Sequence, residues 1–166
     1  MANALLILAG VVLLLVQGVI ARALPTDHLA PVLIIPMVLY MAVGDFSLAR
    51  GVSLAFVMGY LTDVFAGGSM GLWTFTLVSI FLLSRIAGLK LFLHGKVFQV
   101  LLTFVASMVA GLEMVALLLV FDSRPLAVLA ALGVVSTQSL ATAACAPLVF
   151  ALVNRIPTVT PRPEEV

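Results

Sequence analysis

The chain has 166 residues, of which 64% are hydrophobic and 9% are charged. Soluble domains average roughly 45–50% apolar and about 25% charged residues, so this composition excludes an ordinary soluble fold and indicates that lipid surrounds most of the surface. A formal net charge of +1 also excludes the basic surface that nucleic-acid binding requires.

Charged residues divide the chain into apolar segments, each near the length that crosses a bilayer. A hydrocarbon core of about 30 Å takes about 20 residues of helix. We therefore predict an all-α membrane protein, a six-transmembrane-helix bundle in a single domain over residues 1–156. The predicted helices cover residues 3–21, 30–44, 51–66, 72–85, 97–121 and 125–154.

Prolines and glycines mark the ends of several predicted helices. Pro31 suits the first turn of the second helix, and Pro36 is expected to kink it. The glycine-rich run Gly67–Gly71 separates the third helix from the fourth. Residues 157–166 hold three prolines and two glutamates, which predicts a disordered cytoplasmic tail.

The first apolar run has a second interpretation as a cleaved signal peptide. Ala21-Arg22-Ala23 imitates the small-x-small cleavage pattern. We favour a membrane span, because no Lys or Arg precedes the run and because the run exceeds a usual signal-peptide core.

Basic residues predict the orientation, because those of short loops stay preferentially in the cytoplasm. With six spans, two of the eight Lys and Arg residues, Arg22 and Arg124, fall on the side opposite both termini. The other six share the side of the termini, so both termini are expected to be cytoplasmic. These six are Arg50, Arg85, Lys90, Lys96, Arg155 and Arg162.

Small residues recur every fourth position in the third predicted helix. Gly51, Ala55, Gly59 and Asp63 therefore share one face of that helix. Faces of this kind let membrane helices approach closely. We favour an internal packing seam, which similar stripes in the fifth and sixth helices also support, over a docking face for another protein's helix.

Asp63 lies just before the predicted break at Gly67–Gly71. Its carboxylate is placed to accept hydrogen bonds from free backbone N–H groups of that turn and of the following helix start. We favour this capping role over contact with a partner or a ligand.

Glu113 is the acidic residue that lies deepest in a predicted span. An ionisable group at that depth is a functional hypothesis by default. An equally weighted structural role is a hydrogen bond to Gln17 or Gln138, the polar residues of the first and sixth helices.

The stretch Arg85–Lys96 mixes apolar and basic residues, which is typical of a short helix in the membrane interface. Contact with a cytoplasmic partner is the alternative. His94 and the lone Cys145 have no second ligand at metal spacing, so no metal site is expected. The sequence holds no nucleophile, phosphate-binding or paired-carboxylate motif, which predicts a non-enzymatic protein without a cofactor.

The segment from Gly59 to Leu72, GYLTDVFAGGSMGL, followed by an apolar helix ending in Arg85, resembles the central signature of the bacterial rod shape-determining protein MreD family. That family typically shows a Gly, an Asp a turn later, a glycine-rich break and Gly-Leu opening the next helix. Length, helix count and charge placement agree over nearly the whole chain. The resemblance leaves Glu113 and the proline-rich tail unexplained.

The resemblance implies a component of the bacterial cytoplasmic (inner) membrane that helps direct sidewall peptidoglycan synthesis. Its expected partners are an MreC-type bitopic protein and, through it, MreB, RodA and a penicillin-binding transpeptidase, besides membrane lipid. The candidate interaction and structural residues are Gly51, Ala55, Gly59, Asp63, Gly67, Gly71, Arg85 and Glu113.

The MreD family is thought to share its fold with substrate-binding components of energy-coupling-factor vitamin transporters, which gives a second functional hypothesis. Asp63, Trp73 and Glu113 would then converge on a vitamin near the outer end of the bundle. The first helix reads Ala9 then Leu13 and departs from the small-residue stripe common in those components. A generic helper or chaperone-like membrane bundle is the third hypothesis.

Overall fold

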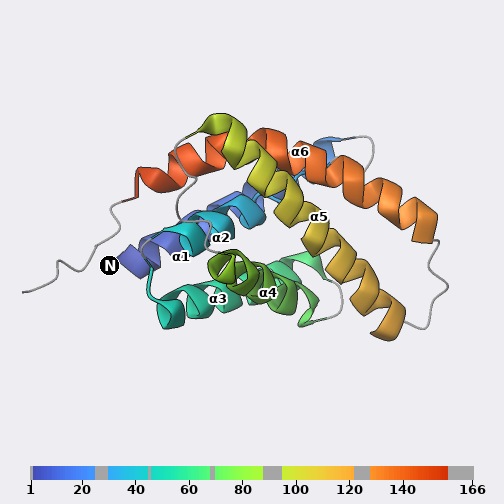
Figure 1. The fold of residues 1–166 in the computed structure, drawn as a ribbon, viewed down its shortest axis with the longest axis horizontal. Helices are drawn as coiled ribbons and strands as arrows, with labels where there is room; N and C mark the ends of the chain where they lie inside the picture. Colours follow the sequence, from blue (N-terminus) through green and yellow to red (C-terminus); the bar gives the residue numbers. More distant parts are fainter. Residues whose placement is uncertain are drawn as a thin grey trace, which may run out of the picture.

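The computed structural model describes residues 2–24, 30–44, 46–67, 70–87, 95–121 and 128–156, all helical or in short connections, without a β-strand among them. The helices alternate in direction along the long axis of the molecule (Figure 1). They are α1 (Ala2–Ala23), α2 (Ile34–Val43), α3 (Leu48–Ala66), α4 (Leu72–Ile86), α5 (Lys96–Phe121) and α6 (Val128–Asn154).

Four of these helices, α1, α3, α5 and α6, are long and apolar enough to cross a membrane. The all-α prediction is therefore confirmed, and the chain has the character of a multi-pass membrane protein. The α4 helix also matches its predicted range but has 15 residues. The predicted start of the last helix at residue 125 and the predicted tail over 157–166 lie outside the described residues.

The second helix is shorter than predicted. It has 10 residues, so it rises about 15 Å, half of a hydrocarbon core. Pro31 lies outside this helix, and Pro36 occupies its first turn, where the missing N–H group has no intrahelical acceptor to lose. Pro36 therefore breaks no hydrogen bond within α2, which removes the reason to expect a kink there.

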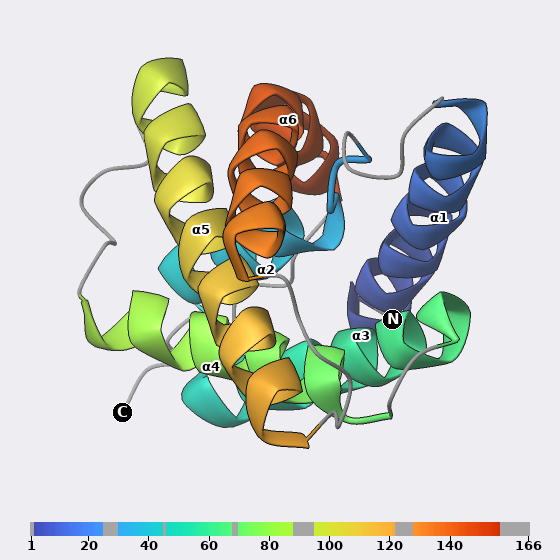
Figure 2. The ribbon, with the colours of Figure 1, turned by 90° about the vertical axis from the view of Figure 1, so that its right-hand side faces the viewer.

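Burial explains how such a short helix is stable in this fold. Every residue of α2 except Tyr40 is buried. Figure 2 shows α2 in the middle of the view, with α1, α5 and α6 around it and the α3–α4 pair along one side. Tertiary packing of its buried side chains therefore stabilises α2 despite its short length.

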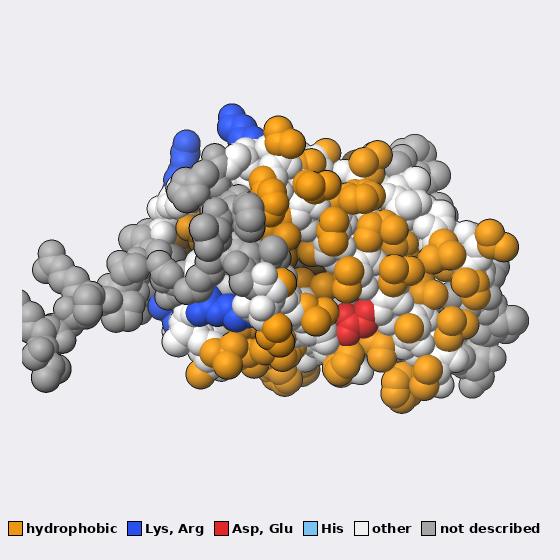
Figure 3. All heavy atoms as spheres, in the orientation of Figure 1, with side chains coloured by type: hydrophobic (Ala, Val, Ile, Leu, Met, Phe, Trp, Pro, Cys, Tyr) orange, Lys and Arg blue, Asp and Glu red, His pale blue; other side chains and the backbone are white. Residues whose placement is uncertain are grey.

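The molecule has two ends that differ in what they contain. At one end, which we call the terminal end, Arg50 Nε donates to Asn3 Oδ1 over 2.6 Å, and Tyr40 Oη donates to Asn154 Oδ1 over 3.1 Å. The other end, which holds the α3–α4 turn, is called the distal end. On the face that Figure 3 shows, Lys and Arg side chains gather toward the terminal end, and most of the remaining surface is apolar.

Close helix contacts at glycines seal the bundle against itself. A Cβ at Gly10 of α1 would overlap the Met58 side chain of α3, and a Cβ at Gly111 of α5 would overlap Val135 of α6. At Gly111 the branched Val135 side chain occupies the space that a Cβ would take, whereas at Gly10 the flexible end of Met58 would have to move.

Candidate functional site: the hairpin and the distal cavity

The stripe of small residues on α3 is the seam between α3 and α4. Gly51, Ala55, Gly59 and Asp63 are all buried. A Cβ at Gly59 would overlap Thr74 Cα and lie 2.9 Å from Thr74 N, and a Cβ at Gly51 would overlap the Phe81 ring. The predicted internal seam is confirmed, so this stripe has no free surface for another protein's helix.

The carboxylate of Asp63 caps the start of α4. Asp63 is 2% exposed. Its Oδ2 accepts from Gly71 N (2.9 Å), Thr74 N (3.1 Å) and Thr74 Oγ1 (2.6 Å), and its Oδ1 accepts from Trp73 N (2.9 Å). The predicted cap is thereby confirmed, with the acceptor supplied by the preceding helix.

Two glycines let the chain reverse between the helices. Gly67 ends α3 with φ +64°, and Gly71 precedes α4 with φ +100°. These left-handed conformations strain residues that carry a Cβ. Glycine at both positions, together with the Asp63 cap, fixes where α3 ends and where α4 begins.

Arg85 lies in the last turn of α4, at the end of the hairpin opposite the Asp63 cap. Its Nη1 donates to Ala42 O (3.0 Å) and Gly44 O (2.8 Å), and its Nη2 donates to Phe46 O (2.6 Å). The side chain thus satisfies carbonyls at and beyond the C-terminus of α2. The Arg85 guanidinium therefore contacts backbone of the fold, whereas the interfacial helix expected over Arg85–Lys96 stays a prediction, because residues 88–94 lie outside the described residues.

Replacing Arg85 by methionine is expected to lower the unfolding free energy by about 2 kcal/mol. Hydrogen bonds to charged groups contribute about 1.5–3 kcal/mol each, and because Arg85 is half-buried, water partly replaces the bonds that are lost. Thermal unfolding in detergent measures the effect. Arg22→Met removes the same charge from an exposed site on α1 and serves as the control. Equal losses in the two variants would contradict a capping role.

Glu113 does not contact either of the amides predicted for it. It hydrogen-bonds the Ser79 side chain of α4, and its Oε2 is buried without a partner among the described residues. Glu113 therefore links α5 to α4. The predicted bond to Gln17 or Gln138 is wrong because both amides serve the backbone that leads into α2.

That backbone, residues 30–33, is not helical although it is buried. Gln17 Oε1 accepts from Leu33 N (3.0 Å), Thr142 Oγ1 accepts from Val32 N (2.9 Å), and Gln138 Nε2 donates to Ala30 O (3.2 Å). Irregular backbone at membrane depth is tolerated only where protein groups satisfy it in this way. The polar residues of α1 and α6 thus permit the short α2.

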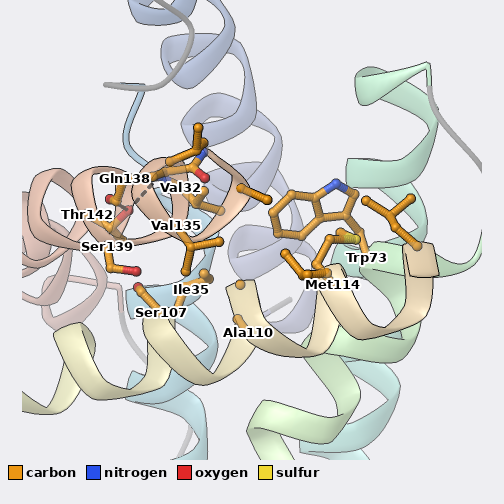
Figure 4. Close-up of a pocket in the computed structure, with 15 residues that line it drawn as sticks. Val32, Ile35, Trp73, Ser107, Ala110, Met114, Val135, Gln138, Ser139 and Thr142 are labelled. Atoms are coloured by element: carbon orange, nitrogen blue, oxygen red, sulfur yellow. Dashed lines mark hydrogen bonds between the residues drawn. The ribbon is translucent and has the colours of Figure 1, made fainter. Parts of the chain in front are cut away.

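A cavity of about 320 Å³, which we call the distal cavity, lies beside this segment, between α2, α4, α5 and α6 (Figure 4). In Figure 4, Ser107, Ser139 and Thr142 gather at one end of the cavity, and Trp73 and Met114 lie at the other. The fifteen residues that line it include no charged side chain.

The convergence of Asp63, Trp73 and Glu113 predicted for a vitamin site is not found in this cavity. Trp73 lines it, but Asp63 and Glu113 do not. Asp63 is fully engaged in capping α4. Sequence reasoning also missed Ser107, Ser139 and Thr142 as cavity residues. Ser107 and Ser139 fall in stripes that indicate close packing, and no local pattern marks Thr142.

Among the described residues, no three His, Cys, Asp or Glu side chains gather to form a metal site.

Comparison of the chain with protein-family models, curated proteins and solved structures finds no match. The fold and the site therefore define the class of protein. It is a helical, multi-pass membrane protein with an α3–α4 hairpin held by the Asp63 and Arg85 hydrogen bonds and with a distal cavity lined by uncharged residues.

Proposed function

We propose that the chain is an MreD-type, non-enzymatic component of the bacterial cell-elongation machinery in the cytoplasmic membrane. In this role it couples an MreC-type bitopic protein, and through it RodA and a penicillin-binding transpeptidase, to the MreB cytoskeleton. The observation that carries the proposal is the α3–α4 hairpin. The residues that resemble the family signature share one structural task there, since Gly59 lies in the seam, Asp63 caps α4, and Arg85 binds the carbonyls beyond α2.

The location of the basic residues supports cytoplasmic termini. Arg50, Arg85 and Lys96 lie at the terminal end, where Lys96 lines a pocket together with Tyr40 and Asn154. Basic residues favour the cytoplasmic side of a membrane protein. In this orientation the distal end and its cavity face the outside of the cell.

A partner helix would bind outside the α3 stripe, because α4 already covers that stripe. Large apolar side chains remain exposed on α1 and α5, among them Leu8 (59%), Val19 (66%) and Leu101 (56%). Contact through such a face would couple proteins by helix packing, without a catalytic group.

Depletion of the protein in its own rod-shaped bacterium is expected to produce round cells with reduced sidewall synthesis. Microscopy and incorporation of a fluorescent D-amino acid measure the two effects. An Arg22→Met chain should restore rods. Normal shape and normal sidewall labelling after depletion would contradict the proposal.

A second candidate, the substrate-binding component of a vitamin uptake transporter with an energy-coupling-factor fold, draws support from the distal cavity of about 320 Å³. Small-molecule sites are typically apolar clefts of about this size with a few polar groups. Depletion would in that case leave cell shape intact and create a requirement for the vitamin in the medium.

A further inference from the structure

The distal cavity has the features of a ligand site that are independent of the shape role. Its closed end is built from buried polar side chains, since Ser107 is 5%, Ser139 is 2% and Thr142 is 0% exposed. Its other end is apolar and half-exposed at Trp73 and Leu118. Polarity therefore changes along the cavity from a closed polar end to an open apolar end.

Ser107 is the residue that points to a ligand. Its Oγ is buried and has no hydrogen-bond partner within the described structure, yet Ser107 lines the cavity. The Figure 4 view places it beside Ser139 at the same end. A buried hydroxyl without a partner destabilises the protein, so a bound group that hydrogen-bonds it would recover that free energy.

The lining also restricts the chemistry of the occupant. A charged ligand would lose its hydration without gaining an opposite charge, because no lining residue is charged. Ser107 and Leu118 are eleven residues apart on α5, which corresponds to about 16 Å along the helix axis. The cavity thus matches an elongated apolar body with a neutral polar group at one end.

We infer that the distal cavity binds a neutral, single-chain amphiphile, with its hydroxyl or carbonyl group at Ser107 and its hydrocarbon chain leading past Met114 to Trp73. A free fatty alcohol is such an amphiphile, because it carries no charged headgroup that the closed, uncharged end would have to accommodate. The inference goes beyond the proposed function and holds whether or not the protein acts in cell shape.

Trp73 makes the inference directly measurable, because it is the one tryptophan in the sequence and it lines the cavity. The full chain in phosphatidylcholine nanodiscs is titrated with bromodecanol, whose bromine quenches tryptophan fluorescence on contact. Quenching is expected to saturate, and bromine at the carbon farthest from the hydroxyl should quench more than bromine beside the hydroxyl. Equal quenching by the two isomers would overturn the binding orientation.

Two variants distinguish the cavity from general partition into the bilayer. Ser107→Ala should weaken bromodecanol binding about threefold to tenfold and leave bromodecane unchanged, without lowering the thermal midpoint. Ala110→Leu fills the cavity and should abolish saturable quenching by both probes. Ala116→Leu, the same change at an exposed position of α5, should leave binding unchanged. Linear quenching that is identical in all four proteins would overturn the inference.

Brominated phosphatidylcholine tests whether a chain of bilayer lipid fills the cavity instead. A lipid chain in the cavity would make nanodiscs of this lipid quench Trp73 less in Ala110→Leu than in the unmodified chain, with decanol restoring fluorescence only in the latter, and this result would overturn the proposed occupant. A free alcohol as occupant predicts equal lipid quenching in both proteins, with saturable bromodecanol quenching retained in the unmodified chain.

Discussion

Replacing Asp63 by leucine is expected to prevent the chain from reaching its folded state at ordinary growth temperature. Three backbone N–H groups and the Thr74 hydroxyl lose their acceptor. At about 1–3 kcal/mol for each unsatisfied buried group, the loss is about 4 kcal/mol or more, against a typical stability of about 5–15 kcal/mol. Yield of monodisperse protein and thermal unfolding in detergent measure the effect.

Two variants show whether the capping geometry is the cause. Asp63→Asn keeps one acceptor oxygen and should lose about half as much stability as Asp63→Leu. Glu113→Leu removes a carboxyl group that makes a single side-chain bond to Ser79, so its loss should be the smallest. A Glu113→Leu loss equal to that of Asp63→Leu would contradict the special role of Asp63.

Replacing Gly59 by alanine is expected to cost about 2–3 kcal/mol, although alanine is the better helix former. The added Cβ meets the Thr74 backbone, lying 2.9 Å from Thr74 N and 3.0 Å from Trp73 O, and backbone cannot rotate aside. The α3–α4 seam would open and the Asp63 cap would be displaced with it. Thermal unfolding and the rate of amide hydrogen exchange in α4 measure both consequences.

Gly18→Ala on α1 is the matched control, because a Cβ there meets nothing within 4 Å. Its stability should stay constant or rise by up to about 1 kcal/mol. Gly51→Ala should fall between the two, since the overlapping Phe81 ring can shift whereas a backbone cannot. A Gly59→Ala protein as stable as Gly18→Ala would show that the seam tolerates a wider separation.

Local sequence patterns predicted the helical class, the α3–α4 hairpin and its cap. Apolar segments between charges locate most helices because lipid requires long uncharged stretches. The four-residue spacing of Gly51, Ala55, Gly59 and Asp63 predicts one helix face, and Asp63 lies only eight residues before Gly71. Helix geometry determines the shared face, and the short turn between Asp63 and Gly71 keeps the carboxylate near the start of the next helix.

The tertiary structure alone decided the short α2, the inward clamp of Arg85 and the distal cavity. Thr142 reaches Val32 across 110 positions of sequence, and Arg85 reaches Gly44 across 41. A glutamine or serine in an apolar helix has the same local signature whether it satisfies distant backbone, as Gln138 does, or has no partner among the described residues, as Ser107 does. Which of the two occurs depends on which helices lie side by side, and no local pattern encodes that arrangement.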